Sequence, residues 1–237
     1  MQVTCPGYNK SETLNNFPLL VVLNTGISGF AYGQFASANG YDLRFSASDG
    51  TTELNYEIEW WDNSGNSYVW VQVPQLTGSS SIWAYWGNPA ASSTPPAYTG
   101  NGGAWDSTFK GVWHLNLGCV DSTANTNNGT SYNNTSVAGR IGGAQSFNGS
   151  TAYISLPNNS SSLRTNIFTV EAWINLNAQH EWQYAFSAGD AGLDRSIIDF
   201  GEVEYPAGTK RFGGCIWPNA GIEGPADAGT YAGQWHQ

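Results

Sequence analysis

The stretch ELNYEIEWWDNSGNSYVWVQV, residues 53–73, decides the fold. Apolar side chains alternate with polar ones over residues 54–60 and again over residues 69–73, and this period of two predicts half-buried β-strands. Between the two runs lies DNSGN, residues 62–66, whose Asp, Asn and Gly residues tolerate the positive φ that tight turns require. We therefore expect two antiparallel strands joined by a turn.

The same alternation recurs along the chain, whereas no long window shows the apolar spacing of an amphipathic helix. Further strands are expected at residues 17–23, 43–45, 82–86, 111–115, 168–176, 182–186, 195–200 and 211–217. Residues 145–156 resemble a hairpin that turns at Asn148-Gly149. Short strands with regular turn signals predict an all-β fold of two antiparallel β-sandwich (jelly-roll) modules.

The domain boundary is indicated by a change in composition. The chain has 237 residues, enough for one large or two modest domains. Residues 88–103 are rich in Pro, Ala, Ser, Thr and Gly but low in charge, as expected of a packed connector. We place one module at residues 1–103 and a second at residues 104–237.

Charge excludes several classes of partner. Charged residues make up 11% of the chain, aromatic residues 14%, and the formal net charge is −10 with only 8 Lys and Arg. Aromatic-rich, charge-poor chains fold rather than stay disordered, and the shortage of basic residues argues against nucleic acid and anionic membrane surfaces. The sequence contains no run of 18 apolar residues, so no membrane-spanning segment is predicted. Met1 begins an expected strand rather than a signal peptide. Cys5, Cys119 and Cys215 are expected as buried free thiols, although one disulfide is the alternative.

Two family resemblances follow from particular stretches. NNFPLLVVLNT, YDLRFSASDGTTELNYEIEWWD, SYVWVQVPQL and SIWAYWGNPAA resemble a domain of unknown function found in secreted bacterial proteins. GVWHLN, DSTANTNNGT, GRIGGAQSFNGSTAYISLP, FTVEAWINL and AGQWHQ resemble the start of a concanavalin-A-like lectin/glucanase domain of the laminin-G-like kind. This resemblance implies a secreted or cell-surface location.

The second resemblance has one departure. In the laminin-G-like family GQWHQ lies near the middle of the domain, whereas here it ends the chain, so closing strands are expected to be missing. The alternative is a different strand order that closes the module without them.

Paired carboxylates are the sequence feature closest to catalysis. Glu57 and Glu59 lie two residues apart on one strand, which can place their carboxyl groups about 6–7 Å apart, as in some glycosidases. A solvated strand face is the competing interpretation and the one we favour. His114 and His236 each follow a Trp and are expected as core histidines, so no catalytic residue is assigned.

An oxygen-rich loop is the candidate metal site. Asp121, Asn127 and Asn128 are closely spaced, and Ca²⁺ takes six to eight oxygen ligands. The loop lacks the EF-hand pattern, and an Asx-turn loop without metal is the alternative. Calcium is therefore the only cofactor considered.

Aromatic side chains are the remaining lead, because sugar rings stack on Trp and Tyr while Asn and Asp take the hydroxyls. We assign ligand binding to Trp61, Trp182, Tyr184, Asp194 and Trp217. The predicted function is non-catalytic binding of an extracellular glycan or polysaccharide by part of a larger secreted protein. We expect a monomer or a segment of a multidomain chain. The alternatives are a structural or adhesion segment that binds proteins, and a glycan-active hydrolase or lyase.

Overall fold

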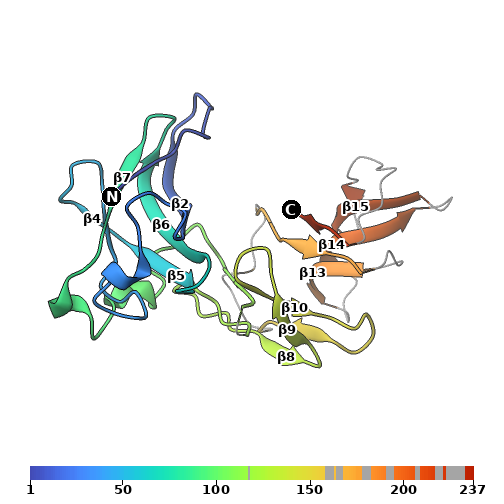
Figure 1. Cartoon of the computed structure of the whole chain (residues 1–237). Helices are drawn as coiled ribbons and strands as arrows, with labels where there is room; N and C mark the ends of the chain where they lie inside the picture. The colour runs from blue at the N-terminus through green and yellow to red at the C-terminus, as the bar shows by residue number, and fades with distance from the viewer. Residues whose placement is uncertain are drawn as a thin grey trace. The chain divides into compact units, whose positions relative to one another are not determined.

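The computed structural model describes residues 1–116, 118–157, 163, 168–177, 183–190, 195–205, 209–216, 221–222 and 233–237. The chain forms two compact units, Met1–Arg164 and Thr165–Gln237. The described strands pair antiparallel, and the described helices are short 3-10 turns, so the predicted all-β class is confirmed (Figure 1). In the described part of the chain, no helix is long and apolar enough to cross a membrane. The module boundary between residues 103 and 104 stays a prediction.

Two antiparallel sheets form the beginning of the first unit (Figure 1). One has the order β1-β7-β3-β4, with β1 Gln2–Thr4, β7 Ser81–Tyr85, β3 Arg44–Ser46 and β4 Glu53–Leu54. The other has the order β2-β6-β5, with β2 Leu14–Leu23, β6 Ser67–Leu76 and β5 Tyr56–Trp60. The stretch that decided the fold is therefore the β5–β6 hairpin.

One hydrophobic core takes side chains from both sheets. The buried members on the strands are Val21, Leu23, Phe45, Leu54, Tyr56, Val69, Val71, Val73, Leu76, Ile82 and Ala84. Because successive side chains on a strand point to opposite faces, this set fixes which residues face outward. Glu57 on β5, Trp70 on β6 and Trp83 on β7 are outward-facing by this rule.

A β-bulge interrupts the alternation at the end of β5. The register of β5 against β6 shifts between Ile58 and Trp60, so that Trp60 lies opposite the outward-facing Tyr68. The sequence pattern placed Trp60 on the core face, and this expectation is wrong because the extra residue of a bulge reverses the side on which later residues lie. Trp61, the next residue, packs against the core instead.

The predicted connector is packed onto the first unit. It contains two 3-10 turns, η2 Pro89–Ala91 and η3 Ala97–Thr99. The Tyr98 ring packs against the core, and its hydroxyl donates to Glu53 Oε1 at 2.5 Å. Asn55 Nδ2 donates to the carbonyl of Gly103 at 2.8 Å. These contacts confirm a packed connector and tie it to β4 and β5.

The later part of the first unit contains two small two-stranded antiparallel sheets. β8 Thr130–Tyr132 pairs with β11 Tyr153–Ser155, and β9 Thr135–Ala138 pairs with β10 Gly143–Ser146. The expected hairpin over 145–156 is wrong, because the strands on either side of Asn148-Gly149 pair with other strands. The strand expected at 111–115 is also absent, since residues 111–116 adopt no regular secondary structure.

The second unit contains a four-stranded antiparallel sheet. Its order is β13-β14-β15-β16, with β13 Gln183–Asp190, β14 Arg195–Tyr205, β15 Thr209–Ile216 and β16 Gly221–Ile222. A separate pair joins β12 Ile174–Asn175 to β17 Trp235–His236. Strands expected near 182, 195 and 211 are confirmed, whereas the strand expected over 168–176 is reduced to β12.

Candidate functional site

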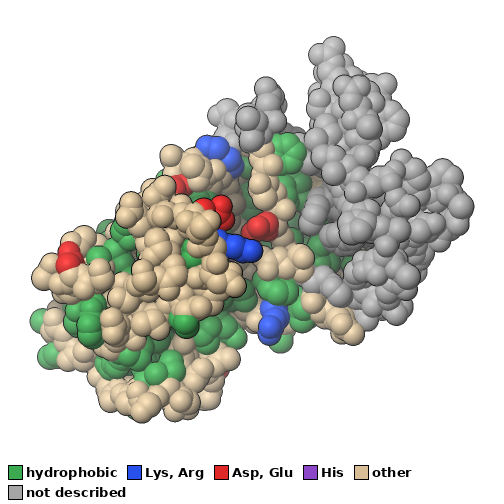
Figure 2. Space-filling model, turned by 90° about the horizontal axis from the view of Figure 1, so that it is seen from above, with side chains coloured by type: hydrophobic (Ala, Val, Ile, Leu, Met, Phe, Trp, Pro, Cys, Tyr) green, Lys and Arg blue, Asp and Glu red, His purple; other side chains and the backbone are tan. Residues whose placement is uncertain are grey.

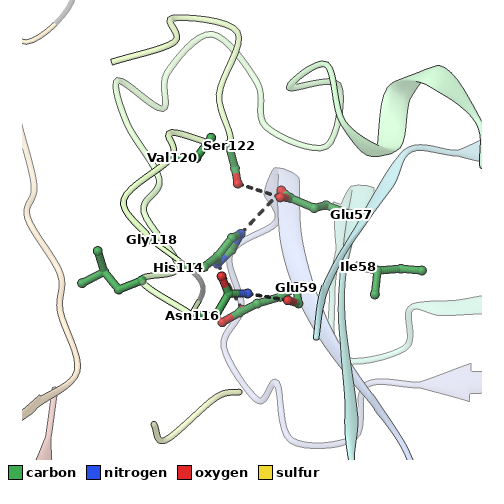
Figure 3. Close-up of a pocket in the computed structure, with 9 residues that line it drawn as sticks. Glu57, Ile58, Glu59, His114, Asn116, Gly118, Val120 and Ser122 are labelled. Carbon is green, nitrogen blue, oxygen red and sulfur yellow. Dashed lines mark hydrogen bonds and ion pairs between the residues drawn. The ribbon is translucent and has the colours of Figure 1, made fainter. Parts of the chain in front are cut away.

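A cavity of about 250 Å³ lies beside β5 in the first unit (Figure 3). Strand β5 supplies one wall, and side chains from residues 114–116 and 118–122 supply the other. The lining residues are Glu57, Ile58, Glu59, His114, Leu115, Asn116, Gly118, Val120 and Ser122. Both candidate carboxylates and a histidine from a distant part of the sequence thus meet at one place.

His114 lies between the two glutamates (Figure 3). Its Nδ1 is 3.1 Å from Glu59 Oε2, and its Nε2 is 3.5 Å from Glu57 Oε2. The 3.5 Å separation is too long for a good hydrogen bond, and Nε2 is a buried atom without a hydrogen-bond partner. His114 is therefore held to Glu57 mainly by charge, and to Glu59 by charge and a hydrogen bond.

Three further side chains complete the network. Trp70 Nε1 donates to Glu59 Oε2, and Trp105 Nε1 donates to Glu57 Oε2, each at 2.6 Å. Ser122 Oγ donates to Glu57 Oε1, also at 2.6 Å. Both glutamates thus accept hydrogen bonds from neighbouring side chains. The outward face of β5, expected to be solvated, is instead covered by residues from segment 105–122, and Glu59 is only 8% exposed.

The network fixes the charge of His114. Burial alone would lower the pKa of this imidazole, but the nearby carboxylates of Glu57 and Glu59 favour the protonated ring, outweigh burial and raise the pKa to about 9. His114 is therefore an imidazolium at neutral pH. An imidazolium cannot act as a general base, and its ring occupies the gap in which a glycosidase pair would hold the scissile bond and a water molecule.

The loop predicted to bind calcium is organised by its own hydrogen bonds. Asp121 Oδ1 accepts from the backbone N–H groups of Val112 and Thr123, each at 3.0 Å. Asp121 Oδ2 accepts from Thr123 Oγ1 at 2.9 Å and from Asn127 N at 2.8 Å. Asn128 Oδ1 accepts from Asp121 N at 2.9 Å.

These contacts occupy the carboxylate's four lone-pair directions. Within the described residues, no group of three or more His, Cys, Asp or Glu side chains is arranged to hold a metal ion. The contacts are those of an Asx-turn loop, and calcium binding stays a prediction.

Of the predicted ligand-binding residues, Trp61 has a described side chain, and it does not line this cavity. Trp61 is half-buried, its ring lies 5.0 Å from Phe35 and 5.4 Å from Tyr32 between centroids, and its Nε1 donates to Ala38 O at 3.0 Å. Trp182, Asp194 and Trp217 lie outside the described residues. The backbone of Tyr184 belongs to β13, but its side chain also lies outside the description. Their role in binding stays a prediction.

An aromatic surface that the sequence analysis did not single out lies on the outer side of β7. Ile82 and Ala84 are core residues, so Trp83 and Tyr85 point away from the core. Trp83 lies directly between Gln2 of β1 and Ser46 of β3, and Tyr85 lies opposite Arg44. Trp83 is half-buried and Tyr85 is 43% exposed.

The alternation over 82–86 contained the signal for this surface, because a core residue on either side of Trp83 requires that Trp83 face outward. What the pattern could not supply was the strand order. The structure places β7 inside the sheet, between β1 and β3, with polar side chains on both flanks.

Comparison with known proteins gives one partial family match. Residues 39–110 match the model of a family described as a domain of unknown function, DUF2341. This range overlaps the first expected module, and the resemblance to a domain of unknown function is confirmed to that extent. No curated protein matches the chain. No solved structure matches it either.

Proposed function

We propose that the chain is a non-catalytic module that binds polysaccharide outside the cell, as part of a larger secreted protein. The observation that carries this proposal is the surface formed by Trp83 and Tyr85 on an inner strand of the sheet β1-β7-β3-β4. Side chains two residues apart on a strand share one face and lie about 7 Å from each other along it. Two rings in this arrangement offer consecutive contacts to an extended chain of sugars.

The side chains around the two rings provide the polar contacts that a sugar needs. The exposed Gln2 lies beside Trp83, and Arg44 forms a 3.8 Å ion pair with the exposed Glu53 on the same face. Ser46, on the other side of Trp83, is only 4% exposed and donates to the Tyr85 hydroxyl at 3.4 Å, so it supports the ring rather than a ligand. The Tyr85 hydroxyl donates to Gly50 O at 3.3 Å, which orients its ring. Binding sites of this kind combine aromatic faces with a few polar groups that fix orientation.

The chain carries few charges, since Asp, Glu, Lys and Arg make up 11% of its residues. On the face of the molecule seen in Figure 2, most of the coloured surface belongs to side chains without charge. Few charged groups on the protein means few favourable pairings with a charged polymer, so neutral glycans are the preferred class.

Catalysis has less support than binding. Glu57 and Glu59 are the carboxylate pair nearest to a cavity, but His114 lies between them and both accept hydrogen bonds from indole groups. We further propose that the two sheets of the first unit form a jelly-roll-type β-sandwich and that the region after residue 103 is concanavalin-A-like. Calcium binding at Asp121 would require the carboxylate to exchange its present hydrogen bonds for the ion, and the comparison with a chelator below tests it.

Affinity electrophoresis in gels that contain single polysaccharides tests the function. The panel comprises cellulose derivatives, xylan, laminarin, mannan, polygalacturonate and chitosan, each with calcium and with a chelator. We expect retardation by at least one neutral polymer. Trp83→Ala with Tyr85→Ala should weaken that binding about tenfold or more, since each lost aromatic contact costs ~1 kcal/mol.

The matched control is Tyr68→Ala, because Tyr68 is a half-buried tyrosine on the outer face of the other sheet. It should leave retardation unchanged. Equal loss in the control variant, or no retardation by any polymer, would contradict the proposal. Release of reducing ends that Glu57→Gln abolishes would instead support the hydrolase alternative.

A further inference from the structure

A second aromatic surface lies on the two-stranded sheet formed by β8 and β11. Tyr132 and Tyr153 are directly opposite each other in the register of these strands. Their rings are stacked, with centroids 4.6 Å apart and an angle of 13° between the planes. They are 42% and 53% exposed, so the pair stands on the surface rather than in a core.

The turns beside this pair hold the rings in place. Asn148 Oδ1 accepts from the backbone N–H groups of Ser150, Thr151 and Ala152 at 2.9–3.0 Å, which fixes the entry into β11. Asn133, which follows Tyr132 with φ +55°, donates from Nδ2 to Thr151 O at 3.2 Å. The end of β8 is therefore tied to the start of β11, and the two rings lie on a surface that is organised before any ligand arrives.

The chemistry around the pair is uncharged. From residue 122 to residue 157 the sequence contains no Asp, Glu, Lys or His, and Arg140 is the single charged residue. Asn, Ser and Thr side chains dominate the stretch, and they offer both donors and acceptors to hydroxyl groups. Aromatic faces beside neutral hydrogen-bonding groups match a neutral sugar better than a charged one.

We infer that Tyr132 and Tyr153 form a second glycan-binding site, separate from the surface of Trp83 and Tyr85, and that its ligand is a neutral oligosaccharide. The inference rests on the proposed function for its class of ligand. Each ring turns one face toward its partner and one face outward, so a sugar packs on an outward face while the amide groups take its hydroxyls. Two sites on one chain increase affinity for a polymer without any new contact.

Isothermal titration with short neutral oligosaccharides measures the number of sites directly. Cellotetraose, xylotetraose, laminaritetraose and mannotetraose serve as probes, with the whole chain in the cell. We expect two sites per chain for the sugar that retards the protein in gels. Tyr132→Thr with Tyr153→Thr should leave one site, and so should Trp83→Ala with Tyr85→Ala. Threonine is chosen because it favours β-strands.

Polymer binding gives a second readout. Each double variant should bind the polymer about ten- to a hundredfold more weakly than the parent, since avidity is lost with either site. Tyr132→Phe with Tyr153→Phe keeps the rings and serves as the matched control for stacking. Its site number should remain two, and unfolding midpoints verify that every variant is folded.

The outcomes separate this inference from the proposed function. If no neutral probe or polymer binds, both are overturned. If one site is found and the Trp83 and Tyr85 variant removes it while the threonine variant does not, the second site alone is overturned. If the threonine variant binds sugars normally but changes the sedimentation of the free protein, the tyrosine pair is a protein contact and the second site is likewise overturned.

Discussion

At the scale of single residues, several ionisable side chains of the first unit are buried or nearly so. Glu57 and Glu59 each contact His114 and also accept a hydrogen bond from an indole group. Asp42 is 1% exposed and accepts from the backbone N–H groups of Ala36, Ser37 and Gly87. Buried charges are tolerated only when they are paired and hydrogen-bonded, so removing one partner should be costly.

The first prediction concerns the pH dependence of stability. The pKa of His114 is raised from 6.5 to about 9 in the folded chain. A raised pKa means that the stabilising contribution is complete below pH 6.5 and is lost as the pH rises through about 9. The free energy of unfolding should therefore fall between pH 6.5 and 9.5, by about 3 kcal/mol at most.

Urea unfolding of the parent and of His114→Gln across this range measures the effect. Glutamine carries no charge to lose, so the difference between the two proteins should shrink with increasing pH. A constant difference would show that His114 is not the titrating group.

The second prediction concerns Asp42. Burial alone would raise the pKa of this carboxyl, but the backbone donors at Ala36, Gly87 and Ser37 outweigh burial and lower it overall. Asp42→Asn should cost about 1.5–3 kcal/mol of unfolding free energy at pH 7, because both carboxylate oxygens accept hydrogen bonds. In asparagine one oxygen becomes an uncharged acceptor and the other is replaced by an NH2 group, which cannot accept. Because a lowered pKa stabilises only above the unfolded value, the cost should diminish below pH 4. Chemical denaturation at pH 7 and pH 3 checks both parts.

At the scale of elements, the alternation of apolar residues predicted most strands of the first unit. It failed at Trp60, because a bulge cannot be seen in a pattern of side-chain types. It failed also over 145–156, where the pattern indicated strands but not their partners. The Glu57–His114–Glu59 contact was missed for the same reason: segment 105–122 covers β5 without being a strand. Sequence periodicity describes a strand's two faces but says nothing of what lies on them.

The third prediction tests how the connector is fixed to the loop after it. A Cβ added to Gly102, at φ +86°, would lie 2.3 Å from the backbone nitrogen of Ala124. Gly29 has a similar φ of +80° but no atom within 4 Å of such a Cβ. Gly29→Ala should therefore show only the cost of positive φ, about 1 kcal/mol. Gly102→Ala should cost clearly more, as measured by thermal unfolding. Equal losses would contradict the close approach.

At the scale of the whole molecule, the first unit extends well beyond the predicted connector. It runs from Met1 to Arg164, so it includes the cavity and both tyrosines of the β8–β11 sheet. The family match ends at residue 110, before His114. The range that matches the family model, residues 39–110, and the compact first unit, Met1–Arg164, thus have different limits in this chain.

The fourth prediction follows from this difference. A fragment of residues 1–164 should unfold cooperatively and retain binding to the polymer. A fragment of residues 1–103 should unfold at lower urea concentration and bind a hydrophobic dye, because it uncovers Trp70 and leaves Glu57 and Glu59 without Trp105, Ser122 and His114. Equal stability of the two fragments would show that segment 105–122 adds nothing to the first unit.

The edges of the sheet β1-β7-β3-β4, which carries Trp83 and Tyr85, also influence how the protein behaves at high concentration. Its outer strands are β1, with three residues, and β4, with two residues and the exposed Glu53. Short, charged edges resist the strand-to-strand pairing by which sheets grow into fibres. A sheet can therefore present Trp83 and Tyr85 on its open face while its sides remain unsuitable for stacking with other copies. Crowding along a polysaccharide should then bring many chains close together without precipitating them.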